Sequence, residues 1–266
     1  GFLGGLAGLL LAPAGFLGGG KDGNGFLFAT LGFTLGGVAL LLGECALACG
    51  QFRRGQRPRG VLVRGATIWT SGPVGRIENG SLLVVDGKIS RIGSMPISDE
   101  TGLPAGSLLI IDGRGKHVTP GLIDTHSHAM ILGGVNEATL PSSAMVRVGD
   151  VVNSETENIY RELAGGLTVA NLLHGSANPI GGQSSLIKLK EGAAPEELKM
   201  RDAPAGIKFA LGENVKQANW GERNVTRFPQ SRMGVGTFLA NRFTAARQYQ
   251  KEWDSFQKSG GLRPRR

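Results

Sequence analysis

The chain has 266 residues, of which 41% are hydrophobic and 19% charged, enough for one or two domains with a hydrophobic core. Its 44 glycines follow no Gly-x-y period, which excludes collagen, and its two cysteines cannot build a disulfide framework. The net charge of +8 is concentrated at the two ends, because residues 1–60 carry +3 and Arg263, Arg265 and Arg266 add another +3. We therefore predict no nucleic-acid partner for the middle of the chain.

Residues 1–60 form a hydrophobic, glycine-rich segment in which residues 26–43 carry no charge. That stretch is long enough for a membrane anchor or the apolar region of an export signal, and Ala46-Leu47-Ala48 resembles a cleavage site followed by Cys49. We expect an exported (periplasmic or extracellular) or membrane-associated protein. The arginines at 53–59 favour a cytoplasmic location as the alternative, and an extension without function is a further one.

Residues 61–117 contain short β-rich runs at 61–69, 81–85, 88–92 and 108–112. Asp86-Gly87 separates two of these runs and is a strong hairpin signal. We predict a small antiparallel β-sandwich domain over 61–117.

From residue 118 onward, strand and helix patterns alternate. Strands are predicted at 122–124, 167–173, 184–189 and 206–211, and a capping box from Ser154 to Glu157 opens a helix that ends at Gly165-Gly166. Such alternation favours parallel pairing. A last helix carries an apolar stripe that we expect to pack against a sheet, with Gly260-Gly261 ending the helix; the stripe comprises Leu239, Phe243, Ala246, Tyr249, Trp253 and Phe256.

Two histidines, His126 and His128, follow the strand predicted at 122–124. Residues i and i+2 of a strand point to the same face, so the two imidazoles can hold one metal ion, and histidine is a common zinc ligand. Asp124 shares that face and is predicted to orient an imidazole.

The run Pro120-Gly-Leu-Ile-Asp-Thr-His-Ser-His128 resembles the amidohydrolase superfamily, in particular its imidazolonepropionase-like and prolidase-like members. Further matching runs are Gly165-Gly-Leu-Thr-Val169, His174-Gly-Ser-Ala-Asn-Pro-Ile-Gly-Gly-Gln183 and Gly206-Ile-Lys-Phe-Ala-Leu-Gly-Glu-Asn214, so that the resemblance covers about residues 60–257.

The resemblance implies an α/β fold in which residues 118–266 form the N-terminal half of a (β/α)₈ TIM-type barrel, about four βα units, preceded by the small β domain. It also implies one or two divalent metals, Zn²⁺ above all, held by His126 and His128. Lys208 matches the bridging lysine of the prolidase-like members, and Glu213 is the alternative ligand. His174, Asn178 and Gln183 would bind substrate at the same end of the barrel.

The implied activity is metal-dependent hydrolysis of a C–N amide or peptide-like bond in a small-molecule or short peptide-like substrate. No histidine follows His174, so the later-strand histidines and aspartate of this family are absent and the catalytic residues stay unassigned. We therefore expect a truncated fragment, inactive alone. The alternative is a non-catalytic, membrane-tethered protein that retains half of a hydrolase fold. The sequence leaves the oligomeric state open.

Overall fold

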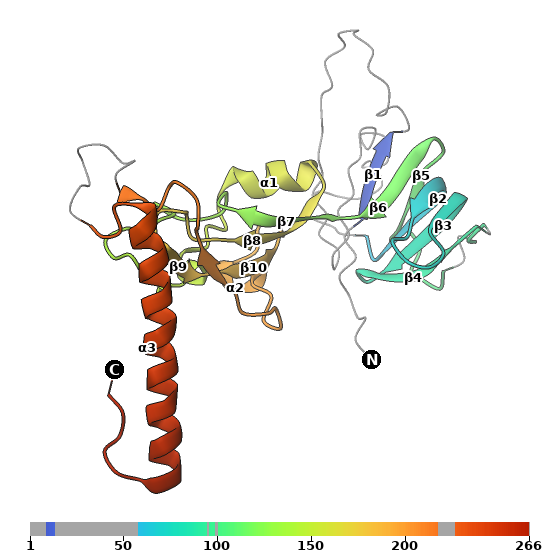
Figure 1. The fold of residues 1–266 in the computed structure, drawn as a ribbon. Coiled ribbons are helices and arrows are strands. Elements are labelled where there is room, and N and C mark those ends of the chain that lie inside the picture. Colours follow the sequence, from blue (N-terminus) through green and yellow to red (C-terminus); the bar gives the residue numbers. More distant parts are fainter. Residues whose placement is uncertain (1–8, 14–57, 95, 99–100, 218–226, 266) are drawn as a thin grey trace. The chain divides into compact units, whose positions relative to one another are not determined.

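The computed structural model describes residues 9–13, 58–94, 96–98, 101–217 and 227–265 (Figure 1). The expected signal or anchor at 26–43, the cleavage site Ala46-Leu47-Ala48 and Cys49 lie outside these residues. Within them, no helix combines the length and the apolar character needed to cross a membrane.

The chain divides into two compact units. The first contains the residues up to Met130, Asn153–Asn171 and Leu186–Asp202, and the second contains Ile131–Val152, Leu172–Ser185 and the residues from Ala203 onward. The domain boundaries predicted at 60 and 117 stay a prediction.

Three strands of the first unit form an antiparallel meander, as predicted: β2 (Gly60–Trp69), β3 (Arg76–Val85) and β4 (Lys88–Gly93). Asp86 and Gly87 join β3 to β4 with φ angles of 46° and 78°. Two successive positive φ angles are what a type I′ hairpin turn requires. The hairpin predicted from Asp86-Gly87 is therefore confirmed.

The sheet is nevertheless mixed, and the expectation of a purely antiparallel sheet is wrong. Both β5 (Leu108–Asp112) and β6 (Lys116–Pro120) pair in parallel with β2, and β1 (Leu9–Pro13) pairs antiparallel with β6. The ten residues of β2 are long enough for two parallel partners, because β5 takes its first half and β6 its second. Sequence patterns alone did not predict β6.

β2 is buried on both faces of this sheet, and its successive residues point to opposite sides. Val61 and Val63 belong to a cluster on one face, which also contains Ala66, Ile68, Leu82, Val84, Leu109, Ile111 and Val118. Leu62 lies on the other face and packs with Leu83 and Ile97.

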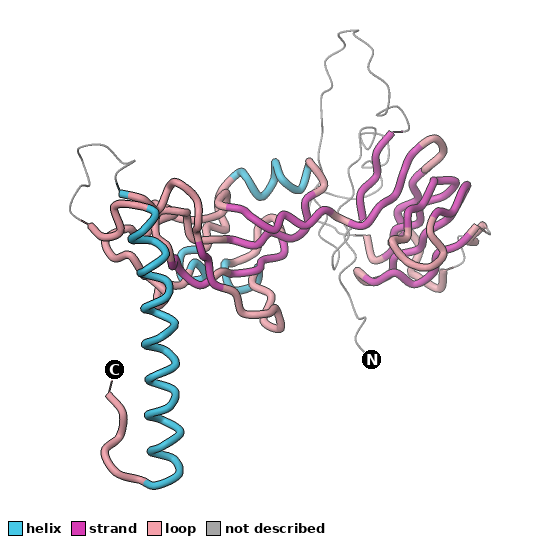
Figure 2. The backbone as a smooth tube through the Cα atoms, viewed as in Figure 1, coloured by secondary structure: helices cyan, strands magenta, loops and turns pink. Residues whose placement is uncertain are grey.

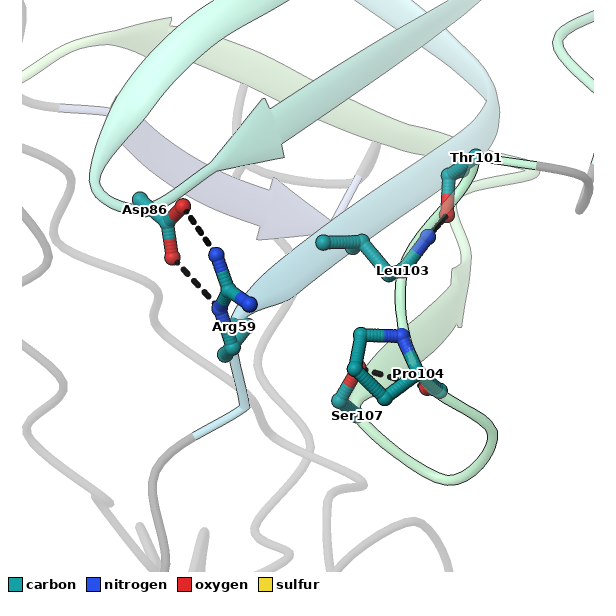
Figure 3. A network of polar contacts seen from close by, with 6 residues as sticks. All are labelled: Arg59, Asp86, Thr101, Leu103, Pro104 and Ser107. Atoms are coloured by element: carbon teal, nitrogen blue, oxygen red, sulfur yellow. Dashed lines mark hydrogen bonds and ion pairs between the residues drawn. The ribbon is translucent and has the colours of Figure 1, made fainter.

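Polar contacts join the residues around the start of β2 to neighbouring turns (Figure 3). The guanidinium of Arg59 donates two hydrogen bonds to the carboxylate of Asp86, at 2.9 and 2.7 Å. Beside them, the hydroxyl of Ser107 donates to the carbonyl of Pro104 at 2.6 Å and forms the turn that leads into β5.

A second sheet has the strand order β10–β8–β7, formed by β7 (Leu122–Ser127), β8 (Leu167–Leu172) and β10 (Ser185–Lys188). Thr168 bonds to the carbonyl of Leu122 and Asn171 to that of Thr125, both across 46 residues, a constant separation typical of parallel neighbours. Figure 2 shows the helix α1 (Glu157–Ala164) near these strands.

The start of α1 differs from the prediction. Thr156, not Ser154, is the N-cap, and its side chain accepts a hydrogen bond from the backbone N–H of Asn158. The helix therefore begins later than the Ser154 capping box implied. Its predicted end is confirmed, since Gly165 is the C-cap.

In the second unit, β9 (Ile180–Gln183) and β11 (Ile207–Phe209) form an antiparallel pair. The expectation that residues 206–211 add a further parallel strand is therefore wrong. Gly181 and Gly182, in the run 174–183 that the resemblance singled out, lie in β9. The shorter helices of the described residues are η2 (Val148–Val151) and α2 (Pro195–Leu198).

The last helix, α3 (Arg232–Ser259), ends at Gly260 as predicted, but only the beginning of its apolar stripe joins the core cluster. Val235 and the partly buried Leu239 pack on Ala210 and Val215, whereas Phe243 is 53% exposed. The expectation that the whole stripe packs against a sheet is thus wrong for the described residues. Helical periodicity shows that one face is apolar, but it does not show what covers that face.

Candidate functional site

His126 and His128 lie at the end of β7, and their side chains point to the same side. Their Nε2 atoms are 3.3 Å apart, and the ring planes meet edge to face at 80°. His126 is exposed and His128 is half-buried, so both rings are accessible. The pairing follows from the two-residue period of a strand, which is the reason the sequence predicted it.

The Nε2 separation fits a shared metal ion. Two nitrogens bound at ~2.0–2.1 Å to one tetrahedral zinc ion lie about 3.3–3.4 Å apart. The two rings are therefore spaced as ligands of one ion would be. The same separation is also within hydrogen-bonding distance of the two ring nitrogens.

Asp124 and Glu162 add carboxylates near this strand. Asp124 accepts a hydrogen bond from the backbone N–H of His126 at 2.9 Å, so it positions His126 through the main chain. Glu162, on α1, has a pKa raised first by burial and then by the negative charge of Asp124. No sequence pattern singled out Glu162, because it stands among the ordinary polar residues of an amphipathic helix.

His174 is buried in the second unit, with 3% of its surface exposed, and both of its ring nitrogens have partners. Nε2 accepts from the backbone N–H of Glu137 at 2.8 Å, and Nδ1 donates to the carbonyl of Gly175 at 2.9 Å. The ring is therefore held as the neutral tautomer with its proton on Nδ1. Binding a metal would break one of these bonds.

Asn178 is completely buried and joins three segments of the second unit. Its Nδ2 donates to the carbonyl of Glu137 and to the hydroxyl of Ser143, each at 2.6 Å. Its Oδ1 accepts from Nη1 of Arg227 at 3.0 Å.

Arg227 completes this network, and sequence reasoning missed it. Its guanidinium also donates to the carbonyls of Ala138, Leu140 and Ala177, so that one side chain holds the loop before η2 against the segment that contains Asn178. Burial lowers the pKa of Arg227. A lone arginine in a polar stretch carries no pattern from which this role could be predicted.

Gln183 ends β9 and is exposed. Its side-chain Nε2 donates to the carbonyl of Ala144 at 3.0 Å. The two glycines before it are required by close approach, because a Cβ on Gly181 would lie 2.8 Å from Nδ1 of His174 and one on Gly182 would lie 2.8 Å from Val146.

Lys208 and Glu213, the two candidate further ligands, also lie in the second unit. Lys208 is in the middle of β11, where burial lowers its pKa and so favours the neutral amine. The carboxylate of Glu213 forms ion pairs with Lys216 and, at 2.7 Å, with Arg232. It would have to exchange these cations for a metal ion.

The predicted residues therefore fall into separate groups. His126 and His128 face one another in the first unit, while His174 and Asn178 are linked through Glu137 in the second. Within the described part of the chain, no three side chains drawn from histidine, cysteine, aspartate and glutamate are grouped closely enough to hold a metal ion.

Several known proteins are similar to this chain, although no known protein-family profile matches it. It is 31% identical over 226 residues to the amidohydrolase tasK of Hapsidospora irregularis, a match that covers 73% of this chain and 22% of that protein. It is 40% identical over 63 residues to the imidazolonepropionase of Shewanella sp. (strain ANA-3), covering 24% of this chain and 15% of that protein.

The fold is similar to the solved structure of an amidohydrolase from Thermotoga maritima MSB8, with a TM-score of 0.63 and 33% identity. That match covers 77% of this chain and 52% of the solved chain. The chain spans less than a quarter of the two curated relatives and about half of the solved one. The fold is a mixed α/β arrangement of the amidohydrolase type. The chain belongs to the amidohydrolase superfamily.

Proposed function

We propose that this chain contributes the first metal-binding strand of a metal-dependent hydrolase that cleaves a C–N amide or peptide-like bond. The observation that carries the proposal is the 3.3 Å separation of the Nε2 atoms of His126 and His128, together with the similarity to amidohydrolases. Residues 118–266 would then form about the first half of the barrel. The substrate would be a small molecule or short peptide-like compound, as the imidazolonepropionase-like and prolidase-like resemblance of the sequence implies.

His126 and His128 would hold the ion, and Asp124 would keep the backbone of His126 in place. A divalent metal such as zinc, bound there, would lower the pKa of a coordinated water toward ~7 and polarise the carbonyl of the bond to be cleaved.

Further ligands are needed, since catalytic zinc sites usually have three protein ligands. Lys208 and Glu213 stay the two predicted further ligands, as the resemblance implies. The substrate-binding role of His174, Asn178 and Gln183 stays a prediction, and of the three only Gln183 is exposed.

No histidine follows His174 in this sequence. We therefore expect the chain to bind metal weakly by itself and to need metal ligands other than its own for turnover. Export or membrane attachment through residues 26–43 stays a prediction as well.

Metal binding by the purified full chain tests the proposal. Zinc uptake, measured by competition with a chromophoric chelator, should weaken at least about tenfold in His126→Ala and in His128→Ala. The matched control is His117→Ala, which removes a histidine of β6 that accepts a hydrogen bond from Nε1 of Trp69 at 3.1 Å. Equal zinc affinity in all four proteins would contradict the assignment.

The Lys208 assignment needs its own variant. If Lys208 is a ligand, Lys208→Met should weaken zinc uptake, while Lys188→Met on β10 should leave it unchanged. Zinc uptake like that of the natural chain in both lysine variants would show that Lys208 is not a ligand.

A further inference from the structure

The C-terminal half of α3 carries a run of three aromatic side chains. Tyr249, Trp253 and Phe256 contact one another edge to face, with ring centroids 6.2 and 5.7 Å apart. All three are half-buried. This differs from the start of α3, where Val235 and Phe238 are buried.

The segment after the helix turns back along it (Figure 1). Gly260 and Gly261 both have positive φ angles, 68° and 103°, which allow the reversal. The guanidinium of Arg263 then lies 5.4 Å above the ring of Trp253, while Leu262 is 96% exposed. An open groove of about 930 Å³ lies between α3 and the returning segment, and we call it the C-terminal groove.

The walls of the C-terminal groove combine apolar and cationic side chains. Phe256, Leu262 and Pro264 supply apolar surface, and Lys251, Arg263 and Arg265 supply positive charge. One carboxylate, that of Glu252, also lines the groove and accepts a hydrogen bond from Gln248 at 3.2 Å.

Positive charge continues from the C-terminal groove along the face of α3 that contains Lys251. Arg247, Lys251 and Lys258 are spaced by four and seven residues, so they lie within about 40° of one another around the helix axis. No carboxylate in the described part of the chain forms an ion pair with any of the three. Asp254, the other acid of this half, accepts from Gln250 at 2.9 Å.

We propose that the C-terminal groove is a docking surface for an acidic peptide segment of a partner protein that carries an apolar anchor residue. The anchor would pack against Phe256 and Leu262, and the flanking carboxylates would meet Lys251, Arg263 and Arg265. Charge complementarity selects this occupant, because cations outnumber carboxylates along the groove and the adjoining helix face.

Other occupants fit less well. A second copy of the same groove would bring like charges together, which opposes association. Stacking of nucleic-acid bases needs open ring faces, whereas Arg263 lies over one face of Trp253. A flat lipid surface would not fill a hollow between a helix and a returning segment.

The test uses the full chain and a short fluorescent peptide in which glutamates flank a single leucine. Its anisotropy should report saturable binding that weakens as salt screens the charges. A peptide with lysines in place of the glutamates should not bind. The double variant Lys251→Glu/Arg263→Glu should weaken binding by about tenfold or more, and circular dichroism should show that its helix content is kept.

The matched control reverses two exposed cations elsewhere, Lys88→Glu/Arg91→Glu on β4, and should bind the peptide like the natural chain. Equal binding of the acidic and basic peptides would overturn the proposal, as would an unchanged affinity in the Lys251/Arg263 variant. Tighter, competing binding of anionic vesicles or of single-stranded DNA would also overturn it, in favour of those partners. Zinc binding at His126 and His128 is a separate measurement, so either proposal can fail alone.

Discussion

Replacing Asn178 with alanine should strongly destabilise the second unit. Asn178 is completely buried and makes three hydrogen bonds, to Glu137, Ser143 and Arg227. Asn178→Ala removes all three at once and leaves their partners inside the protein.

The size of the effect follows from those partners. A buried polar group that loses its partner costs ~1–3 kcal/mol. The Ser143 hydroxyl can turn, and Arg227 keeps three backbone carbonyls, so the carbonyl of Glu137 bears the main loss. We expect a loss of about 3 kcal/mol in the free energy of unfolding, a large share of the ~5–15 kcal/mol of an ordinary domain.

Urea unfolding followed by circular dichroism measures the total, and hydrogen exchange locates it. The backbone N–H groups of Glu137 and Ala177, which bond to His174 and Asn136, should lose protection. Ser143→Ala is the control, because it removes only one acceptor of Asn178 and should cost about 1 kcal/mol. If Asn178→Ala is no less stable than Ser143→Ala, the network does not hold the loop as described.

Two further outcomes concern the first unit. Gly121→Ala should lower the free energy of unfolding by roughly 1–3 kcal/mol through overpacking, because the new Cβ would lie 2.3 Å from the side chain of Thr168. Gly93→Ala is the control: its Cβ would meet no atom within 4 Å, so thermal unfolding should be nearly unchanged. The pKa of Asp112 is lowered to about 2, chiefly by its hydrogen bonds with Arg114. This contact therefore stabilises the folded state above pH ~3.9, and the stabilisation is lost as the pH falls toward 2. In an NMR titration, Arg114→Ala should return the Asp112 midpoint toward ~3.9, and an unchanged midpoint would refute this cause.

Local chemistry predicted part of this structure. Asp86-Gly87 predicted its hairpin because few other residue pairs adopt two positive φ angles easily. The facing of His126 and His128 follows in the same way from the two-residue period of a strand. In both cases the determining residues are neighbours in the chain.

Features that depend on distant partners were not predictable in this way. Gly181 and Gly182 allow His174 and Val146 to approach closely, and the local sequence does not predict these neighbours. The parallel pairing of β6 with β2, and the four acceptors of Arg227, join residues that are far apart in sequence. No local pattern encodes such partners.

The mixed pairing of β2 has a consequence for the order in which the first sheet can assemble. The strands β2, β3 and β4 are joined by short turns, so their contacts close small loops at little entropic cost. The parallel partners β5 and β6 reach β2 only across some forty residues or more of chain, and such non-local pairings slow folding. Amide protection in the β2–β4 meander should therefore develop ahead of protection in β5 and β6 when the denatured chain is returned to native conditions.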